Sequence, residues 1–147
     1  MTTRYWSPPK PGDIVQCRFP EDTFAIPGPK ERPALVTKVE TRAGIVDVEV
    51  AYGTSQRIGD VHPGEFVVRR GDPDAGLQKD TKFDLCNIVA LPFDKDWFVA
   101  DPARRFGEHP KRGRLNLDNA ENKKRLHAAV TEAKDAGKVP TRPKRNT

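Results

Sequence analysis

The hydrophobic positions of the first hundred residues follow the two-residue period of β-strands. The clearest case is residues 45–52, where three valines alternate with Asp47, Glu49 and Ala51. This alternation predicts a strand that buries its valine face and exposes the other face to solvent. Four further strands are predicted from short apolar runs bounded by proline or glycine, at 13–19, 32–40, 64–69 and 82–91.

Short strands separated by turn signals at this density predict a mainly β fold in the form of a small barrel. We expect the barrel to span residues 12–100. Its expected core consists of seven apolar residues: Ile14, Val36, Val46, Val48, Val50, Phe66 and Val89. The proline-rich segment 20–31 predicts a long irregular connection, and long loops in compact domains often carry function.

The pattern changes to a helical period near the C-terminus. Leu126, Ala129, Val130 and Ala133 have the i, i+3, i+4, i+7 spacing of an amphipathic helix, which we place at 119–136. This apolar stripe needs a partner, either the barrel or a second copy of the chain.

Polar residues mark the ends of this helix. Asp118 and Glu121 have the spacing of a capping box, with Asp118 as N-cap, and Gly137 is a natural C-terminal stop. The expected organisation is a flexible arm at 1–11, the barrel, a basic extension at 101–137 that contains the helix, and a disordered basic tail at 138–147.

The charge of the chain is unevenly distributed. The net charge is +5, yet residues 1–100 hold 13 basic and 15 acidic residues, whereas residues 101–147 hold 13 and 6. A positive C-terminal third raises affinity for polyanions without conferring sequence preference. A solvated tail that keeps the protein soluble explains the same charge equally well.

Two classes of protein are disfavoured by composition. Two cysteines and three scattered histidines lack the spacing of a metal site, so neither a metal nor another cofactor is expected. No run of 18 apolar residues exists, and residues 1–6 lack the apolar centre of a signal peptide. We therefore expect a soluble, cytoplasmic protein without a membrane partner.

Three segments, in this order and spacing, resemble the PemK/MazF toxins of type II toxin–antitoxin systems. They are 12–15 (GDIV), 32–36 (RPALV) and 51–56 (AYGTSQ), and residues 81–98 fit the late strand of that family. The resemblance covers about residues 11–100 and implies a small SH3-like barrel, usually a homodimer, that cleaves single-stranded RNA without a metal. It also implies a cognate antitoxin with an acidic disordered tail. The C-terminal α-helix departs from the family pattern and is predicted from its apolar stripe alone.

The resemblance also implies a catalytic pair, and neighbouring polar residues are candidates to bind the substrate. Arg32 and Thr54 match the catalytic pair of the family, and Ser55, Gln56 and Lys30 are the expected substrate-binding residues. The implied reaction is attack of a ribose 2′-hydroxyl on the adjacent phosphate. A planar guanidinium can stabilise the charge that builds on the phosphate oxygens.

Simpler roles for the catalytic pair stay open at this stage. Arg32 could form a surface ion pair with Glu31 or Glu49, and an ion pair with Glu31 would blunt activity. Thr54 could be only a turn residue after Gly53.

Other side chains, and the function itself, have alternatives too. Glu21 and Asp22 could act as a base, and Trp6, Tyr52 and Trp97 could stack on bases or simply pack. A non-catalytic module that binds nucleic acid or protein is the main alternative function. A gyrase-poisoning toxin on the same barrel is less favoured.

Overall fold

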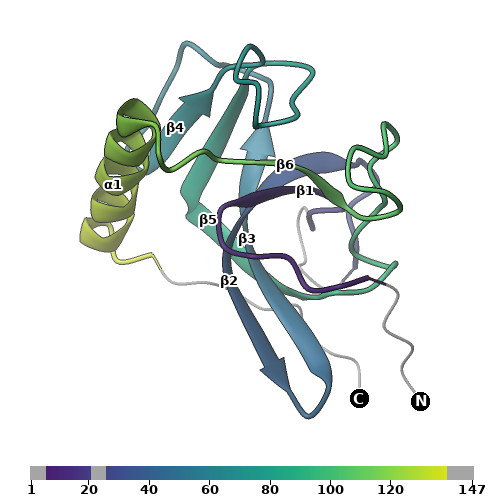
Figure 1. Cartoon of the computed structure of the whole chain (residues 1–147). Coiled ribbons are helices and arrows are strands. Elements are labelled where there is room, and N and C mark those ends of the chain that lie inside the picture. The colour runs from purple at the N-terminus through teal and green to yellow at the C-terminus, as the bar shows by residue number, and fades with distance from the viewer. Residues whose placement is uncertain (1–5, 21–25, 139–147) are drawn as a thin grey trace.

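The described part of the chain folds into a curled antiparallel sheet followed by a C-terminal helix. A computed structural model describes residues 6–20 and 26–138 (Figure 1). Within them lie the strands β1 (Asp13–Cys17), β2 (Arg32–Arg42), β3 (Ile45–Thr54), β4 (Glu65–Val68), β5 (Thr81–Pro92) and β6 (Lys111–Arg114), and the helix α1 (Ala120–Asp135). The strand order is β4-β5-β3-β2-β1-β6. The prediction of a mainly β fold is confirmed.

The two edge strands, β4 and β6, do not pair with each other, so strand pairing leaves the sheet open. The irregular segment between β4 and β5 lies against β6 instead. The backbone N–H of Arg114 donates to the carbonyl oxygen of Asp74 at 2.8 Å. A side chain on Gly76 would overlap the carbonyl oxygen of Arg112. Residues 74–76 therefore cover the exposed edge of β6.

Each face of the sheet contributes residues to an apolar cluster of its own, although the far ends of β2 and β3 are partly exposed. Consecutive residues of a strand point to opposite faces, so Val36 and Leu35 belong to different apolar clusters. One cluster includes Val48 and Val50 and is closed by bulky residues such as Phe98. The other lies beneath α1. All seven predicted core residues are buried, but Ile14 and Phe66 lie in the second cluster and the other five in the first.

The predicted boundary at residue 100 is wrong. Strand β6 lies in the basic extension and pairs with β1, so the sheet continues beyond the predicted barrel range. The sequence of β6, Lys-Arg-Gly-Arg, has no apolar alternation and gave no strand signal. Its position depends on tertiary contact, because a side chain on Gly113 would overlap the backbone of Ala75.

Helix α1 packs on β4 and β5 of its own chain. Ala129 and Ala133 are buried in the second cluster, and Leu126 and Val130 are partly buried against it. The predicted N-cap is wrong by one residue. Asn119, not Asp118, is the N-cap, and its Oδ1 accepts the N–H groups of Glu121 and Asn122.

The C-terminal end of α1 matches its prediction. Gly137 adopts a left-handed conformation with φ of 71°. The N–H of Lys138 donates to the carbonyl oxygen of Ala133, which closes the last turn. Residues 139–147 of the expected disordered tail lie outside the described residues. In the part of the chain that is described, no helix is long and apolar enough to cross a membrane.

The N-terminal segment is anchored rather than loose from residue 6 onward. Trp6 is buried in the first apolar cluster, with its ring centroid 5.6 Å from that of Phe93. His109 Nε2 lies 2.8 Å from the carbonyl oxygen of Ser7. The expected flexible arm is therefore wrong for its second half, and residues 1–5 lie outside the described residues.

Candidate functional site

The start of β2 and the end of β3 bring Arg32 and Thr54 together. Ala34 pairs with Tyr52 in the antiparallel register of these strands. Continuing that register by two residues places Arg32 opposite Thr54. Gly53 makes the close approach possible, because a side chain there would overlap the carbonyl oxygen of Pro33. The site therefore depends on a glycine at the point where the two strands end.

A small cleft of about 150 Å³ opens at this junction. Its polar lining includes Glu31, Arg32, Thr54, Ser55, Lys79 and Arg112. Pockets for drug-sized molecules are usually about 300–1,000 Å³, so this one accommodates a single small group, such as a phosphate, rather than a whole nucleotide. With three basic side chains and one carboxylate, the cleft favours an anion.

Arg32 rests on an aromatic ring and is not held by a carboxylate. Its guanidinium carbon lies 5.5 Å from the ring centroid of Tyr52, and that ring meets Phe19 edge-on at 5.1 Å. Among residues 6–20 and 26–138, no carboxylate lies within ion-pair distance of Arg32, which excludes the surface pairs with Glu31 and Glu49 in this part of the chain. The Tyr52 ring instead supports the guanidinium through a cation–π contact.

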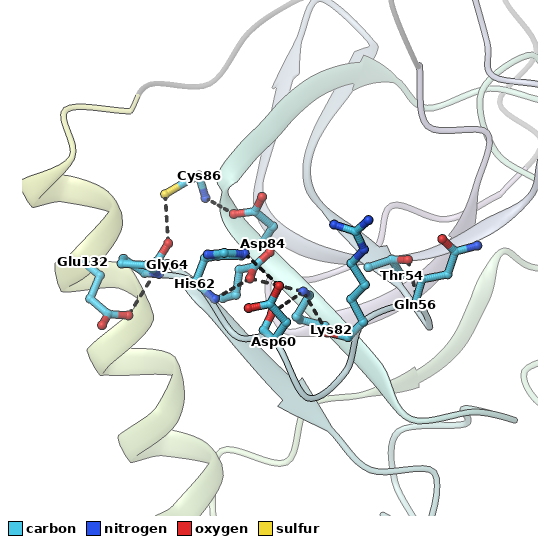
Figure 2. A network of polar contacts seen from close by, with 12 residues as sticks. Thr54, Gln56, Asp60, His62, Gly64, Lys82, Asp84, Cys86 and Glu132 are labelled. Atoms are coloured by element: carbon cyan, nitrogen blue, oxygen red, sulfur yellow. Dashed lines mark hydrogen bonds and ion pairs between the residues drawn. The ribbon is translucent and has the colours of Figure 1, made fainter.

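Thr54 forms a local turn and also lines the cleft. Its Oγ1 accepts the backbone N–H of Gln56 at 3.1 Å, shown in Figure 2. Thr54 is therefore a turn residue, as the simpler interpretation held, because its side chain accepts a hydrogen bond from nearby backbone. A hydroxyl that accepts one hydrogen bond can still donate its proton, so Thr54 can also bind an oxygen of a ligand.

The expected binding residues divide into two groups. Ser55 lines the cleft and is exposed. Gln56 and Lys30 are exposed and do not line it, so the structure does not bring them to the pair. Gln56 contributes through its backbone instead, by fixing the Thr54 hydroxyl.

Arg112 of β6 is a site residue that the sequence analysis missed. Its Nη1 donates to Gln16 Oε1 at 2.7 Å, and its Nε donates to the carbonyl oxygen of Gly76 at 3.3 Å. Burial lowers the pKa of Arg112 from its ordinary value, although the nearby Asp101 opposes this effect. The only sequence signal was the basic run at 111–114, which has no apolar pattern to indicate a strand.

The loop that follows Thr54 is anchored by a buried lysine. Lys82 pairs with Thr54 across β3 and β5, and its Nζ donates to the carbonyl oxygens of Asp60 at 2.7 Å and Arg57 at 3.2 Å. The same ammonium lies 3.3 Å from Glu65 Oε1, with the two side chains only 6% and 12% exposed. Figure 2 shows the Lys82 ammonium beside Asp60, with dashed contacts gathered around it. Lys82 therefore fixes the loop at 55–64.

The far end of this loop is tied to β5 and α1. Glu132 of α1 accepts the backbone N–H of Gly64 at 3.0 Å, and Cys86 Sγ lies 3.6 Å from the carbonyl oxygen of Pro63. Asp84 accepts the backbone N–H of Cys86 at 2.8 Å. Burial raises the pKa of Asp84, an effect that Glu65 reinforces and this hydrogen bond opposes. The helix is thereby linked to the loop that begins at the cleft.

The remaining candidates from the sequence lie away from the cleft. Trp6 and Trp97 are buried and pack in the first apolar cluster, so they are not available for base stacking. Glu21 and Asp22 lie outside the described residues. The described residues contain no group of three or more His, Cys, Asp or Glu side chains arranged to hold a metal ion.

Comparison with protein-family models and with curated proteins gives no match. A functional assignment therefore depends on the cleft and on the motifs that surround it.

Proposed function

We propose that this protein is an endoribonuclease that cleaves single-stranded RNA without a metal, the toxin of a type II toxin–antitoxin pair. One observation carries the proposal: Arg32 and Thr54, singled out by the resemblance to PemK/MazF toxins, line the same basic cleft. The size of the cleft suits a phosphate group, which is the group that such an enzyme must hold.

The proposed reaction is a transesterification at phosphorus. The 2′-oxygen of a ribose attacks the adjacent phosphate and forms a 2′-O–P bond, while the P–O5′ bond breaks. The 2′-hydroxyl loses a proton and the departing 5′-oxygen gains one. The products are a 2′,3′-cyclic phosphate and a 5′-hydroxyl, so no external water or co-reactant enters this step.

Each cleft residue has a role in this step. The Arg32 guanidinium stabilises the charge that builds on the non-bridging oxygens, and its planar fork can donate to two oxygens at once. The Thr54 hydroxyl donates to a phosphate oxygen or orients the 2′-hydroxyl. Glu31 is the carboxylate in the described lining of the cleft, which makes it the candidate to accept the 2′-hydroxyl proton.

The wider proposal follows the family resemblance. The curled sheet corresponds to an SH3-like barrel, in which residues 74–76 take the place of strand pairing between β4 and β6. The protein would act as a homodimer in the cytoplasm, where its RNA substrate is found. A cognate antitoxin with an acidic, disordered tail would be attracted to the same basic cleft.

A non-catalytic module that binds nucleic acid is the second candidate. The observation that favours it is the Thr54 hydroxyl, which already accepts a local backbone hydrogen bond. Three basic side chains in one cleft would suffice for binding without cleavage.

Cleavage of single-stranded RNA in EDTA distinguishes the two functions. Wild-type protein should release fragments with 2′,3′-cyclic phosphate ends. Arg32→Ala should reduce the rate by about 10²–10³, the usual cost of losing one stabiliser of transition-state charge, and Thr54→Ala should have a smaller effect. Arg42→Ala is the matched control, because Arg42 lies at the other end of β2 with an exposed side chain. RNA that is bound but left intact would favour the binding module.

A further inference from the structure

Arg112 lies in the cleft with a charge that no carboxylate neutralises directly. Its two hydrogen bonds, to Gln16 and to the backbone of Gly76, have neutral acceptors. Among the described residues no carboxylate lies within ion-pair distance of this guanidinium. Two of the five N–H groups of the guanidinium make these hydrogen bonds, and within residues 6–20 and 26–138 the other three have no hydrogen-bond acceptor.

A half-buried cation in this situation is costly unless an anion joins it. Removing a charge from water is unfavourable, and proteins offset the cost with an opposite charge or a full set of hydrogen bonds. The nearby Asp101 is paired with Arg105 at 3.2 Å and only partly offsets the effect of burial on Arg112. The groups that share the cleft with Arg112 do not supply the opposite charge either: Arg32 and Lys79 are basic, and Glu31 is exposed. The cleft is thus prepared for an anionic ligand.

The position of Arg112 relative to Arg32 is fixed by β1. Gln16, which holds the Arg112 guanidinium, is buried and pairs with Pro33 across β1 and β2. Pro33 directly follows Arg32. Arg32 of β2 and Arg112 of β6, from the strands on either side of β1, therefore line one small cleft, and the buried Gln16 of β1 holds Arg112 there.

We propose that Arg112 is a phosphate-binding residue that holds, through its guanidinium fork, a phosphodiester group of single-stranded nucleic acid in the cleft beside Arg32. This inference rests on the proposed function for the identity of the ligand. Arg112 holds the phosphate that Arg32 activates, so the basic C-terminal extension contributes to the site itself and not only to a general positive field.

Binding to an uncleavable ligand tests this role separately from catalysis. A single-stranded oligonucleotide with 2′-O-methyl groups lacks the attacking hydroxyl, and its affinity can be measured over a range of salt concentrations. Losing one phosphate contact should lower the slope of log affinity against log salt by about 0.7. Arg112→Gln should show this reduction together with a roughly tenfold weaker affinity, as expected for a charged hydrogen bond.

Arg114→Gln is the matched control. Arg114 belongs to the same strand, its replacement removes the same charge, and its side chain is exposed outside the cleft lining. It should keep the wild-type salt slope. An Arg112→Gln slope equal to that of wild type, or an equal loss in Arg114→Gln, would overturn the proposal.

Arg112→Lys separates phosphate binding from a purely structural role of Arg112. Arg112→Lys keeps the charge but loses the fork, so its salt slope should be retained while its affinity falls. If Arg112→Gln does not fold, NMR of the wild-type protein decides: the Arg112 Nε–H resonance, assigned by its loss in Arg112→Lys, should move when the oligonucleotide is added. A resonance that does not move would refute phosphate binding.

The outcome for Arg112 is separable from the outcome for cleavage. If Arg112→Gln loses the salt slope and unmodified RNA stays intact, the phosphate site stands and the nuclease proposal fails. If RNA is cleaved and Arg112→Gln binds with the wild-type slope, the nuclease proposal stands and Arg112 is only a structural residue.

Discussion

The carbonyl oxygen of Pro33 occupies the space in which a side chain on Gly53 would begin. The same hypothetical methyl group would lie 2.9 Å from the Phe83 ring. One of these obstacles is backbone, which cannot rotate away, so strands β2 and β3 would have to separate at the cleft.

Gly53→Ala should therefore destabilise the fold by about 1–3 kcal/mol, the usual cost of overpacking a close contact. It should also reduce RNA cleavage, because Thr54 follows directly. Gly59→Ala is the control, since no neighbouring heavy atom lies within 4 Å of the added methyl and Gly59 does not have a positive φ, so the substitution should stabilise the fold by at most about 1 kcal/mol. Urea unfolding measures the stability of both variants. Equal urea midpoints for Gly53→Ala and Gly59→Ala would show that the close approach of β2 and β3 at Gly53 does not matter for stability.

Lys82→Met should be among the most damaging single changes to the loop at 55–64. It leaves the Glu65 carboxylate buried without its cation and removes the donor from two backbone carbonyls. Breaking one side of a buried ion pair costs about 3–5 kcal/mol. Lys38→Met is the comparison, because Lys38 pairs with Glu40 at a 57% exposed position.

The surface pair should be worth less than about 1 kcal/mol by the same urea measurement. The thiol of Cys86 provides a second readout, since it contacts the carbonyl oxygen of Pro63 in the loop. Thiol reagents should modify Cys86 faster in Lys82→Met than in wild type. Unchanged labelling together with unchanged stability would mean that Lys82 does not anchor the loop.

The Asp84 carboxyl should make the folded protein more stable at acidic pH than at neutral pH. Burial raises the pKa of Asp84 above the ordinary 3.8, so the folded protein binds this proton more tightly than the unfolded chain. The contribution of the Asp84 carboxyl to the free energy of unfolding is fully present below pH 3.8. It is lost as the pH rises through the higher pKa of the folded state. Above that higher pKa the folded protein carries a partly buried, ionised carboxylate.

Asp84→Asn removes that charge and keeps an oxygen that can accept the N–H of Cys86. The variant should therefore be more stable than wild type at neutral pH, and the gain should shrink as the pH is lowered towards 3.8. Urea unfolding of both proteins across this range provides the test. A gain that is independent of pH would point to packing rather than ionisation.

The parts of the fold that were predictable are those with local pattern. The alternation at Val46, Val48 and Val50 identified β3 and its buried face, since burial of one face of a strand imposes period two. Strand β6 has no such pattern. Its Gly113 fits against the backbone of Ala75, and that contact exists only after the chain has folded.

The candidate site shows the same division. Arg32 and Thr54 were found because each sits in a local motif, whereas Arg112 joins them through tertiary structure alone. Lys82 follows the same logic: a lysine in a strand is normally exposed, and only the loop folded over it explains its 5% exposure. Residues whose role depends on distant partners leave no trace in local sequence.

At the N-terminus of α1, two residues are candidates for the N-cap. The sequence offers Asp118 with Glu121 as a capping box, but Asn119 Oδ1 accepts the N–H of Glu121 at 3.0 Å and of Asn122 at 3.1 Å. Asn119→Ala should cost about 1 kcal/mol, because it leaves these amides without their acceptor at the helix end. Asp118→Ala should cost only a few tenths of a kcal/mol, roughly the loss of a negative charge near the helix N-terminus. Thermal unfolding of the two variants side by side decides between the caps. A larger loss of stability in Asp118→Ala than in Asn119→Ala would show that Asp118 is the N-cap, and it would contradict the observed start of the helix.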